Sequence, residues 1–365
     1  MRIGYDASPV RGNRTGVEHY TVRLLEALRG LDDVEIVAFS GLAVPDLPEV
    51  VVRPSRMPLA LWRQVVLPRL VRDAGCTSFH SAVTAMSLRL RVPVTVMLHD
   101  FSWQVVSECY SRTAWFKQWF WFRAAARRAA CFVAVSERTR QDVIDRYPHL
   151  ADRIVAILSG PVAARLPAPD PDLQAELRLR FDIPGRFVLA VGRVERRKNP
   201  VYVIRAFASA TGSGDLSDVK LVFAGPPGNA QADAEATAGR LGVADRVVFC
   251  SHLGAELAQL YAAADLLVYA SRDEGFGHPP FEAISFGTPV VASDIPVLRE
   301  VLDGGGELVP LDRPDELAGV IRRALTDSEY RRELIARGRT RLGELSWDAT
   351  ARGVVELHRR LTGLA

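Results

Sequence analysis

Short apolar runs with the pattern of buried strands alternate along the whole chain with amphipathic runs typical of helices. This alternation limits the fold more than any other feature of the sequence. The predicted strands are rich in β-branched and aromatic residues, and they lie at 2–6, 34–39, 94–98, 131–135, 153–158, 187–192, 219–225, 246–250, 266–270 and 288–293. Helical runs such as 17–28 and 136–147 lie between them. Such alternation predicts an α/β protein whose parallel sheets carry helices on both faces.

The chain has 365 residues, which favours two domains over one. A stretch rich in Pro, Ala and Asp at 160–172 has no apolar period and is typical of an interdomain linker. We therefore expect domains at 1–165 and 166–345, followed by a helix at 346–365. Ligands of doubly wound sheets bind at the carboxyl ends of the strands, so the residues directly after strands are the functional candidates.

The composition is that of an ordinary globular protein, with 48% hydrophobic and 24% charged residues. No apolar run approaches the roughly 18–20 residues that cross a bilayer, and the N-terminus lacks the form of a secretory signal. The four cysteines are scattered, and no pair has metal-ligand spacing. We expect a cytoplasmic protein with reduced cysteines and no bound metal.

The two halves of the chain differ in charge. Residues 1–165 carry 22 Arg and Lys against 15 Asp and Glu, whereas the remainder carries 24 against 28. This asymmetry indicates different partners for the two halves. The basic residues are almost all arginine, and the three lysines are Lys117, Lys198 and Lys220. A lysine retained in such a chain is a candidate for a specific role.

Three segments after predicted strands carry polar candidates. In GRVERRKNP (192–200), Arg193 and Lys198 suit a diphosphate, although a solvated basic turn is the alternative. In VMLHDFSW (96–103), His99 can bond a substrate hydroxyl or shuttle a proton, or serve a structural role; His80 is a weaker case of the same kind. RGNRTGVEHYT (11–21) has glycines that permit close approach of a ligand, but it lacks the GxGxxG fingerprint of dinucleotide enzymes.

The segment EGFGHPPFE (274–282) places two glutamates eight residues apart, around two glycines and a Pro-Pro pair. It follows a predicted strand and enters a helix that we expect to begin near Pro280, with Glu282 in the first helical turn. Exposed backbone N–H groups and the helix dipole favour an anion there, while the two carboxylates can accept hydrogen bonds from hydroxyls. A sugar nucleotide combines a diphosphate with hydroxyls on both sides.

This region, EGFGHPPFEAISFGTPVVASDIPVLREV, resembles the E-x7-E signature of retaining glycosyltransferases of family 4, which have the GT-B fold. Six further segments resemble the family's motifs in the family's order: IGYDASPVRGNRTGVEHYTVRLL, LHD, VAVSERTRQDV, VGRVERRKN, AELAQLYAAADLLVYASRDEGFG and LSWDATARGVVELHRRL. The resemblance implies two Rossmann-like doubly wound domains facing a central cleft. Residues 1–165 would bind the acceptor and 166–345 the nucleotide sugar, and the helix at 346–365 would pack back toward the N-terminal domain.

The resemblance also implies roles for individual residues. The implied catalytic residues are Glu274, Arg193, Lys198 and His99, and the implied donor-binding residues are Gly16, His252, Leu253, Phe276, Gly277, His278 and Glu282. Arg193 and Lys198 would hold the diphosphate, while Glu274 and the backbone after it orient the transferred sugar. Glu282 would accept the ribose hydroxyls, and the backbone at 252–253 would contact the base. Gly16 would approach the diphosphate, and His99 would lie near the sugar and the acceptor.

Three departures from the family pattern stand out: Glu18 replaces a frequent glycine, ILSG (157–160) replaces an Asn-Gly turn, and His278 replaces a leucine or isoleucine. The implied reaction retains the anomeric configuration, and since no nucleophile is apparent we favour front-side attack. The Asp-x-Asp pair of many metal-dependent transferases occurs only in the linker, at 170–172, so neither metal nor cofactor is expected.

The resemblance is to bacterial mannosyltransferases, which implies GDP-mannose as donor and a glycan or lipid-linked glycan as acceptor, as in O-antigen or other cell-surface polysaccharide synthesis. UDP-glucose and UDP-N-acetylglucosamine are rival donors. A non-catalytic sugar-nucleotide-binding protein and a phosphorylase of the same architecture are the other readings. The aromatic and basic segment 111–130 indicates either peripheral membrane contact or a core helix with a basic edge. No nucleic acid partner is expected.

Overall fold

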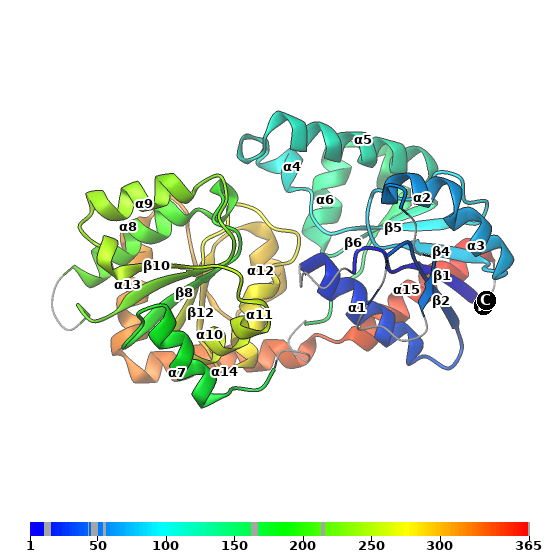
Figure 1. The fold of residues 1–365 in the computed structure, drawn as a ribbon. Helices are drawn as coiled ribbons and strands as arrows, with labels where there is room; N and C mark the ends of the chain where they lie inside the picture. Colours follow the sequence, from blue (N-terminus) through cyan, green and yellow to red (C-terminus); the bar gives the residue numbers. More distant parts are fainter. Residues whose placement is uncertain are drawn as a thin grey trace. The chain divides into compact units, whose positions relative to one another are not determined.

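The computed structural model describes residues 1–10, 16–42, 44, 50–53, 56–161, 167–212 and 216–363. It divides into an N-terminal unit, Met1–Gly160 with Leu345–Ala365, and a C-terminal unit, Pro161–Glu344 (Figure 1). The predicted linker extends too far, because Asp170 caps a helix that already begins at Pro171. Its residues 162–166 lie outside the described residues.

The N-terminal unit is built on a parallel sheet in the order β3-β2-β1-β4-β5-β6-β7. Its strands are β1 (Arg2–Asp6), β2 (Glu35–Ser40), β3 (Val50–Val52), β4 (Ser78–Ser81), β5 (Val94–Leu98), β6 (Cys131–Ala134) and β7 (Ile154–Ala156). Its helices are α1 (Gly16–Arg29), α2 (Leu59–Val65), α3 (Leu67–Asp73), α4 (Ser102–Val105), α5 (Arg112–Arg128), α6 (Glu137–Arg146) and α15 (Trp347–Thr362). On one face of the sheet, α2, α3, α5 and α6 enclose a hydrophobic core, and α1 packs with α15.

The C-terminal unit repeats the scheme with the parallel order β10-β9-β8-β11-β12-β13. Its strands are β8 (Phe187–Val191), β9 (Lys220–Ala224), β10 (Val247–Cys250), β11 (Leu266–Tyr269), β12 (Val290–Ser293) and β13 (Glu307–Val309). Its helices are α7 (Pro171–Arg180), α8 (Pro200–Thr211), α9 (Gln231–Arg240), α10 (Leu257–Ala263), α11 (His278–Ser285), α12 (Pro296–Leu302), α13 (Pro314–Thr326) and α14 (Ser328–Glu344). Helices α8, α9 and α13 pack together on one face, and α11 packs with α10 and α14 (Figure 1). Two doubly wound parallel sheets confirm the predicted fold class.

Each strand predicted from the sequence is present, with its ends within two residues of the predicted ones, whereas β3, β4 and β13 were not predicted. Strand β4 is informative because its sequence is SFHS and all four residues are buried. Its polar side chains find partners inside the fold. Thr95 bonds His80 Nδ1 at 2.8 Å and His358 Nε2 at 2.9 Å, and His358 Nδ1 bonds the Ser78 hydroxyl at 2.8 Å.

This buried chain of hydrogen bonds links β4 and β5 to α15, which lies more than 250 residues later in the sequence. The same helix packs Trp347 against Tyr20, with 5.2 Å between the ring centroids, and Thr350 donates to the Leu158 carbonyl at 2.8 Å. The segment ILSG (157–160) therefore forms part of the surface against which α15 packs. His80 is fully buried within the strand, which favours the structural role over the functional one of the two that the sequence left open.

Acidification should destabilise this unit. Burial lowers the pKa of His358 to about 3 and that of His80 well below its usual 6.5, so both are neutral when folded and take up protons on unfolding. The contribution of the two histidines to the free energy of unfolding is therefore fully present above about pH 6.5 and decreases at lower pH. Each histidine should lower the free energy of unfolding by about 1.4 kcal/mol when the pH falls from 7.5 to 5.5. Urea unfolding at both pH values, for the natural chain and His358→Gln, measures this effect. An unchanged pH dependence in the variant would contradict it.

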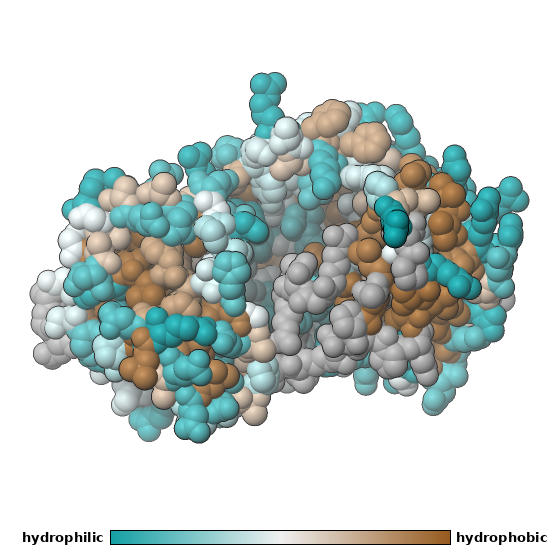
Figure 2. Space-filling model, in the orientation of Figure 1, coloured by the Kyte–Doolittle hydropathy of each residue, from teal (hydrophilic) through white to brown (hydrophobic). Residues whose placement is uncertain are grey.

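Helix α5 is neither fully buried nor free of the core. Phe122 and Ala125 are buried and Trp115 and Trp119 pack against the core, as a core helix requires. Phe116 and Phe120 are 58% and 50% exposed, and Arg123 lies over the Trp119 ring at 5.0 Å. Figure 2 shows hydrophobic and hydrophilic residues mixed along this helix. Among the described residues, no helix has both the length and the apolar character to cross a bilayer.

Candidate active site

The candidate site of the C-terminal unit lies where the strand order reverses. Strands β8 and β11 are neighbours in the sheet, yet the connection from β8 runs outward to β9 and that from β11 runs the other way to β12. Loops that leave such a switch point diverge and open a crevice at the carboxyl edge. The loop after β8 carries Arg193 and Lys198, and the loop after β11 carries Glu274. The topology thus brings together two segments that are about 80 residues apart.

The backbone after β8 is shaped to carry Lys198 inward. Gly192 has φ of +123°, and a Cβ there would lie 3.1 Å from Lys198 Cε, so the absent side chain makes room for the lysine stem. A short turn of 3₁₀ helix follows at Arg196–Lys198, and Asn199 in the left-handed region then directs the chain into α8.

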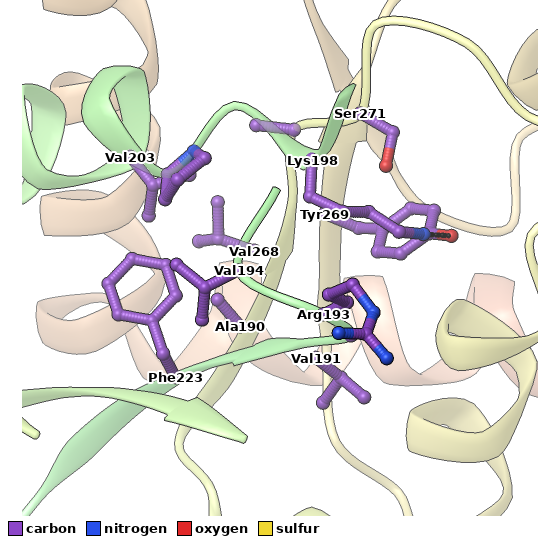
Figure 3. A pocket seen from close by; sticks show the side chains of 13 residues that line it. Ala190, Val191, Arg193, Val194, Lys198, Val203, Phe223, Val268, Tyr269 and Ser271 are labelled. Atoms are coloured by element: carbon purple, nitrogen blue, oxygen red, sulfur yellow. Dashed lines mark hydrogen bonds between the residues drawn. The ribbon is translucent and has the colours of Figure 1, made fainter. Parts of the chain in front are cut away.

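Lys198 lies between an acid and an aromatic ring. Its Nζ donates to Glu274 Oε1 at 2.5 Å and to the Tyr269 hydroxyl at 2.6 Å, and it lies 4.5 Å from the centre of the Tyr269 ring. Figure 3 shows the lysine side chain extended along this ring, with its nitrogen at the hydroxyl. Burial lowers the pKa of Lys198, and Glu274 opposes this by favouring the charged form. The ammonium group is therefore largely shielded from solvent and is paired with one carboxylate.

Arg197 is a functional candidate that sequence reasoning missed. One guanidinium nitrogen lies 2.8 Å from Glu274 Oε2 and donates to the Asp273 carbonyl at 2.8 Å, and another lies 3.1 Å from Glu195. Burial alone would raise the pKa of Glu274, but the charges of Arg197 and Lys198 outweigh it and hold that pKa far below its usual range. Glu274 is therefore an ionised carboxylate clamped by two cations.

We expected Arg193 and Lys198 to hold the diphosphate together, but in the structure their side chains have different partners. The side chain of Arg193 is exposed and donates to the Pro227 carbonyl at 2.9 Å, whereas Lys198 is held by Glu274. Both residues line the same small cavity of about 20 Å³, although the guanidinium of Arg193 lies apart from the Lys198–Tyr269 pair (Figure 3). The loop sequence RVERRK (193–198) contains three arginines, and only the fold shows that Arg197 is the one that reaches Glu274.

Helix α11 starts earlier than predicted. Gly277, with φ of +87°, precedes the first helical residue, His278, so Pro279 and Pro280 are the second and third residues of the helix. Glu282 therefore lies in the second turn and not in the first. It is buried and accepts a hydrogen bond of 2.5 Å from the Tyr261 hydroxyl. Burial raises the pKa of Glu282, while Tyr261 and Lys198 oppose the rise. The two glutamates of the signature thus differ in electrostatic environment.

The other predicted donor-binding residues of the C-terminal unit also occupy the carboxyl edge of its sheet. Phe276 is buried with its ring centroid 4.9 Å from that of His278 and 5.3 Å from that of Phe281, so its side chain fixes the loop. His252 follows β10 in the left-handed region, with φ of +60°, and Leu253 is buried beside it. Strand β10 lies two strands from β8, or roughly 10 Å. That separation is comparable to the length of a nucleoside diphosphate.

The N-terminal unit has its own cavity, of about 560 Å³, at the carboxyl edge of its sheet. It is lined by residues that follow β1, β4 and β5 and by helices α2, α4 and α5, among them Pro9, Arg63, Val83, His99, Trp103, Lys117 and Trp121. His99 Nε2 lies 2.8 Å from the Ala82 carbonyl. Because a carbonyl only accepts, the ring proton is on Nε2 and Nδ1 remains an acceptor. Burial lowers the pKa of His99, which keeps this neutral form.

A buried ion pair shapes the polar wall of this cavity. Arg63 Nε and Nη2 lie 3.0 and 2.9 Å from Asp6 Oδ2, and both side chains are almost fully buried. Gly16 is the first residue of α1 and is exposed, while Glu18 in the same turn is buried. The segment RGNRT (11–15), including Gly12, lies outside the described residues. Among the described residues, no three His, Cys, Asp or Glu side chains gather as metal ligands.

Two family models match the chain in tandem. Residues 14–161 match the model described as Glycosyltransferase Family 4, and residues 178–341 match Glycosyl transferases group 1. Together they span most of both units. The first model ends at the boundary between the units, and the second ends within α14, just before that helix leads back to the N-terminal unit.

Several curated relatives carry the name D-inositol 3-phosphate glycosyltransferase. The protein from Acidothermus cellulolyticus is 33% identical over 228 residues, which cover 60% of this chain and 50% of the relative. That from Salinispora tropica is 34% identical over 242 residues, with 62% and 50% covered. The chain spans about half the length of the curated relatives it matches.

Solved structures share the whole fold at low identity. Sucrose-phosphate synthase from Thermosynechococcus elongatus matches with a TM-score of 0.75 and 23% identity over all of both chains. HepE from Anabaena, in complex with UDP and glucose, matches with a TM-score of 0.72 and 20% identity over 98% and 99% of the chains. WaaG, a glycosyltransferase involved in lipopolysaccharide biosynthesis, matches with a TM-score of 0.71 and 18% identity over all of both chains. The N-terminal unit therefore matches the Glycosyltransferase Family 4 model and the C-terminal unit the Glycosyl transferases group 1 model, and the whole chain has the GT-B fold of the solved structures.

Proposed function

We propose that this protein transfers a hexose from a nucleoside diphosphate to a hydroxyl of an acceptor, with retention of the anomeric configuration. The observation that carries the proposal is the cluster of Lys198, Arg197 and Glu274 at the switch point of the C-terminal sheet. It places two half-buried cations and one ionised carboxylate beside the N-terminus of α11. These are the groups that a departing diphosphate and the hydroxyls of a sugar require.

In the proposed mechanism Lys198 exchanges its partner. With the donor bound, the ammonium turns from Glu274 toward the diphosphate, whose negative charge grows as the glycosidic bond breaks. Arg197 remains on Glu274 and keeps it ionised, so Glu274 can accept hydrogen bonds from the transferred sugar. Arg193, exposed at the mouth of the same cavity, adds a second cation to the phosphates. Glu282, positioned by Tyr261, accepts the ribose hydroxyls.

The acceptor is proposed to occupy the 560 Å³ cavity of the N-terminal unit. Trp121 offers a flat apolar wall on which a sugar ring can stack, while Nδ1 of His99 accepts a hydrogen bond from an acceptor hydroxyl. Lys117 adds positive charge, whereas the charge of Arg63 is balanced by Asp6. The cavity suits a glycan or lipid-linked glycan, and it also suits an acceptor that carries a phosphate, as the name of the curated relatives suggests.

The proposed donor is GDP-mannose. UDP-glucose and UDP-N-acetylglucosamine are the alternatives, since a structural neighbour was captured with UDP and glucose.

The exposed Phe116 and Phe120 of α5, beside Lys117 and Arg123, suit peripheral contact with an anionic membrane surface that would present a lipid-linked acceptor. We propose a retaining, metal-independent reaction by front-side attack.

Thermal unfolding with nucleoside diphosphates and their sugars, with and without EDTA, tests the donor assignment. We expect a rise in Tm with GDP, a larger rise with GDP-mannose, and no effect of EDTA, because ligands that bind only the folded state stabilise it. A preference for UDP would keep the reaction and replace the donor. If EDTA abolished the shift, the metal-independent mechanism would be wrong. If no nucleotide raised Tm at millimolar concentration, the transferase proposal itself would fail.

A further inference from the structure

A second large cavity in the N-terminal unit, of about 700 Å³, is ringed by arginines. Five of them line it, from α3, from the segment between β4 and β5, and from the end of α5: Arg69, Arg72, Arg89, Arg91 and Arg128. Val71, Leu90 and Val92 form an apolar floor. No Asp or Glu is among the described residues that line this cavity.

This cavity lies at the opposite edge of the sheet from the proposed acceptor site. Cys76, Arg91 and Arg128 come shortly before β4, β5 and β6, whereas His99 and the other acceptor-site residues follow the strands. In a parallel sheet these positions lie at opposite ends, and a strand of four or five residues spans roughly 13–17 Å. The arginine cavity is therefore a separate site and not an extension of the transfer site.

Most of its positive charge is unpaired. Arg128 donates to the carbonyls of Leu88 and Leu90 at 3.3 and 2.9 Å, which places its charge at the rim without neutralising it. Arg72 is paired with Asp73, whose carboxylate lies 2.7 Å from Nη2.

The side chains of Arg69, Arg89 and Arg91 have no ion pair or hydrogen bond within the described part of the chain. Burial raises the pKa of the Cys76 thiol to about 11, so it adds no negative charge. At least three guanidinium groups therefore face one hollow without a counter-charge.

We propose that this cavity binds a phosphate-bearing anion, as an anchoring or regulatory site distinct from the transferase centre. Guanidinium forks match phosphate oxygens in pairs, and arginines from separate elements give the convergent geometry that a polyanion needs. Like charges gathered without a partner repel one another, and a bound anion removes that repulsion. The apolar floor accommodates the carbon portion of such a ligand. The proposal does not depend on the identity of the sugar donor or on catalysis.

The test uses the full chain, the double variant Arg89→Gln/Arg91→Gln, and the matched control Arg56→Gln/Arg352→Gln. The control removes two exposed arginines of the same unit that do not line the cavity. One arm titrates inorganic pyrophosphate by calorimetry. The other measures co-sedimentation with vesicles of equimolar phosphatidylglycerol and phosphatidylcholine, against phosphatidylcholine alone. All substituted side chains are exposed, and equal Tm values would verify that the proteins fold alike.

We expect the Arg89/Arg91 variant to bind at least about tenfold more weakly than the natural chain and the control, with affinity that falls as salt rises. A loss in the pyrophosphate arm identifies a soluble phosphate ligand, and a loss confined to phosphatidylglycerol vesicles identifies a lipid headgroup. Either result supports the site. Equal binding by all three proteins in both arms would overturn it. Because sugar transfer by the variant should remain at the natural rate with saturating donor, failure of this proposal leaves the proposed function intact.

Discussion

Glu274→Gln is expected to lower the rate of sugar transfer by about 10²–10³, the loss typical of removing one preorganised electrostatic group from an active site. The glutamine keeps the shape of the side chain but removes the charge that Arg197 and Lys198 share. The two cations then repel each other, so the free protein should also lose stability. A nucleoside diphosphate supplies the missing negative charge, and it should raise the Tm of the variant more than that of the natural chain. Steady-state rates and thermal unfolding with and without nucleotide measure both effects.

Glu195→Gln is the matched control for this substitution. Glu195 also pairs with Arg197, at 3.1 Å, and it is about one quarter exposed. Removing its charge should leave transfer within a few-fold of the natural rate. A Glu274→Gln protein that retained more than a tenth of the natural rate would show that the carboxylate does not act on the transferred sugar, and the proposed mechanism would need another acid.

Lys198→Met is expected to weaken nucleoside diphosphate binding and to lower turnover by about 10²–10³, since Lys198 is the half-buried cation proposed to meet the leaving group. Methionine has a similar length and fits beside the Tyr269 ring, so the fold should be retained. The variant leaves Arg197 paired with Glu274. Calorimetric titration with the nucleoside diphosphate, together with kcat and KM for the donor, separates the binding effect from the catalytic one.

Lys220→Met provides the control, because Lys220 is another of the three lysines and lies in the same unit. It pairs with Asp182 at 2.6 Å at the start of β9, which is the opposite edge of the sheet from Lys198. The same change of charge at that position should alter neither nucleotide affinity nor turnover. Equal effects of the two substitutions would mean that the net charge of the unit, and not contact by Lys198, governs binding.

The fold was largely predictable because central strands of parallel sheets are continuous apolar runs. VTVML and FVLAV pair on both sides and are buried on both faces, so their sequences alone identify them. Strand β4 was missed for a physical reason. SFHS is buried through hydrogen bonds to Thr95 and to His358, and a partner more than 250 residues away leaves no local signal. Strands β3 and β13 are three-residue edge strands, too short for a period to be visible.

The candidate site was predictable at the level of loops but not of side chains. Lys198 and Glu274 were named from strand-end positions, and the fold places them 2.5 Å apart. Which arginine of the loop joins them depends on the 3₁₀ turn at Arg196–Lys198, and nothing in ERRK indicates that turn. The start of α11 was misplaced by two residues because a proline is acceptable throughout a first helical turn, and the left-handed backbone of Gly277 sets the start at His278.

The position of α15 has a consequence for the order in which the protein can form during synthesis. The C-terminal unit is continuous in sequence and has all of its strands once Val309 has been translated, whereas the N-terminal unit includes the last helix of the chain. Until that helix has left the ribosome, His80, Thr95 and Ser78 are without the histidine that completes their hydrogen bonds, and the surface of α1 is uncovered. The N-terminal unit is therefore synthesised first but completes its folding last. While the C-terminal unit is being synthesised, part of the core of the N-terminal unit stays exposed to solvent or to chaperones.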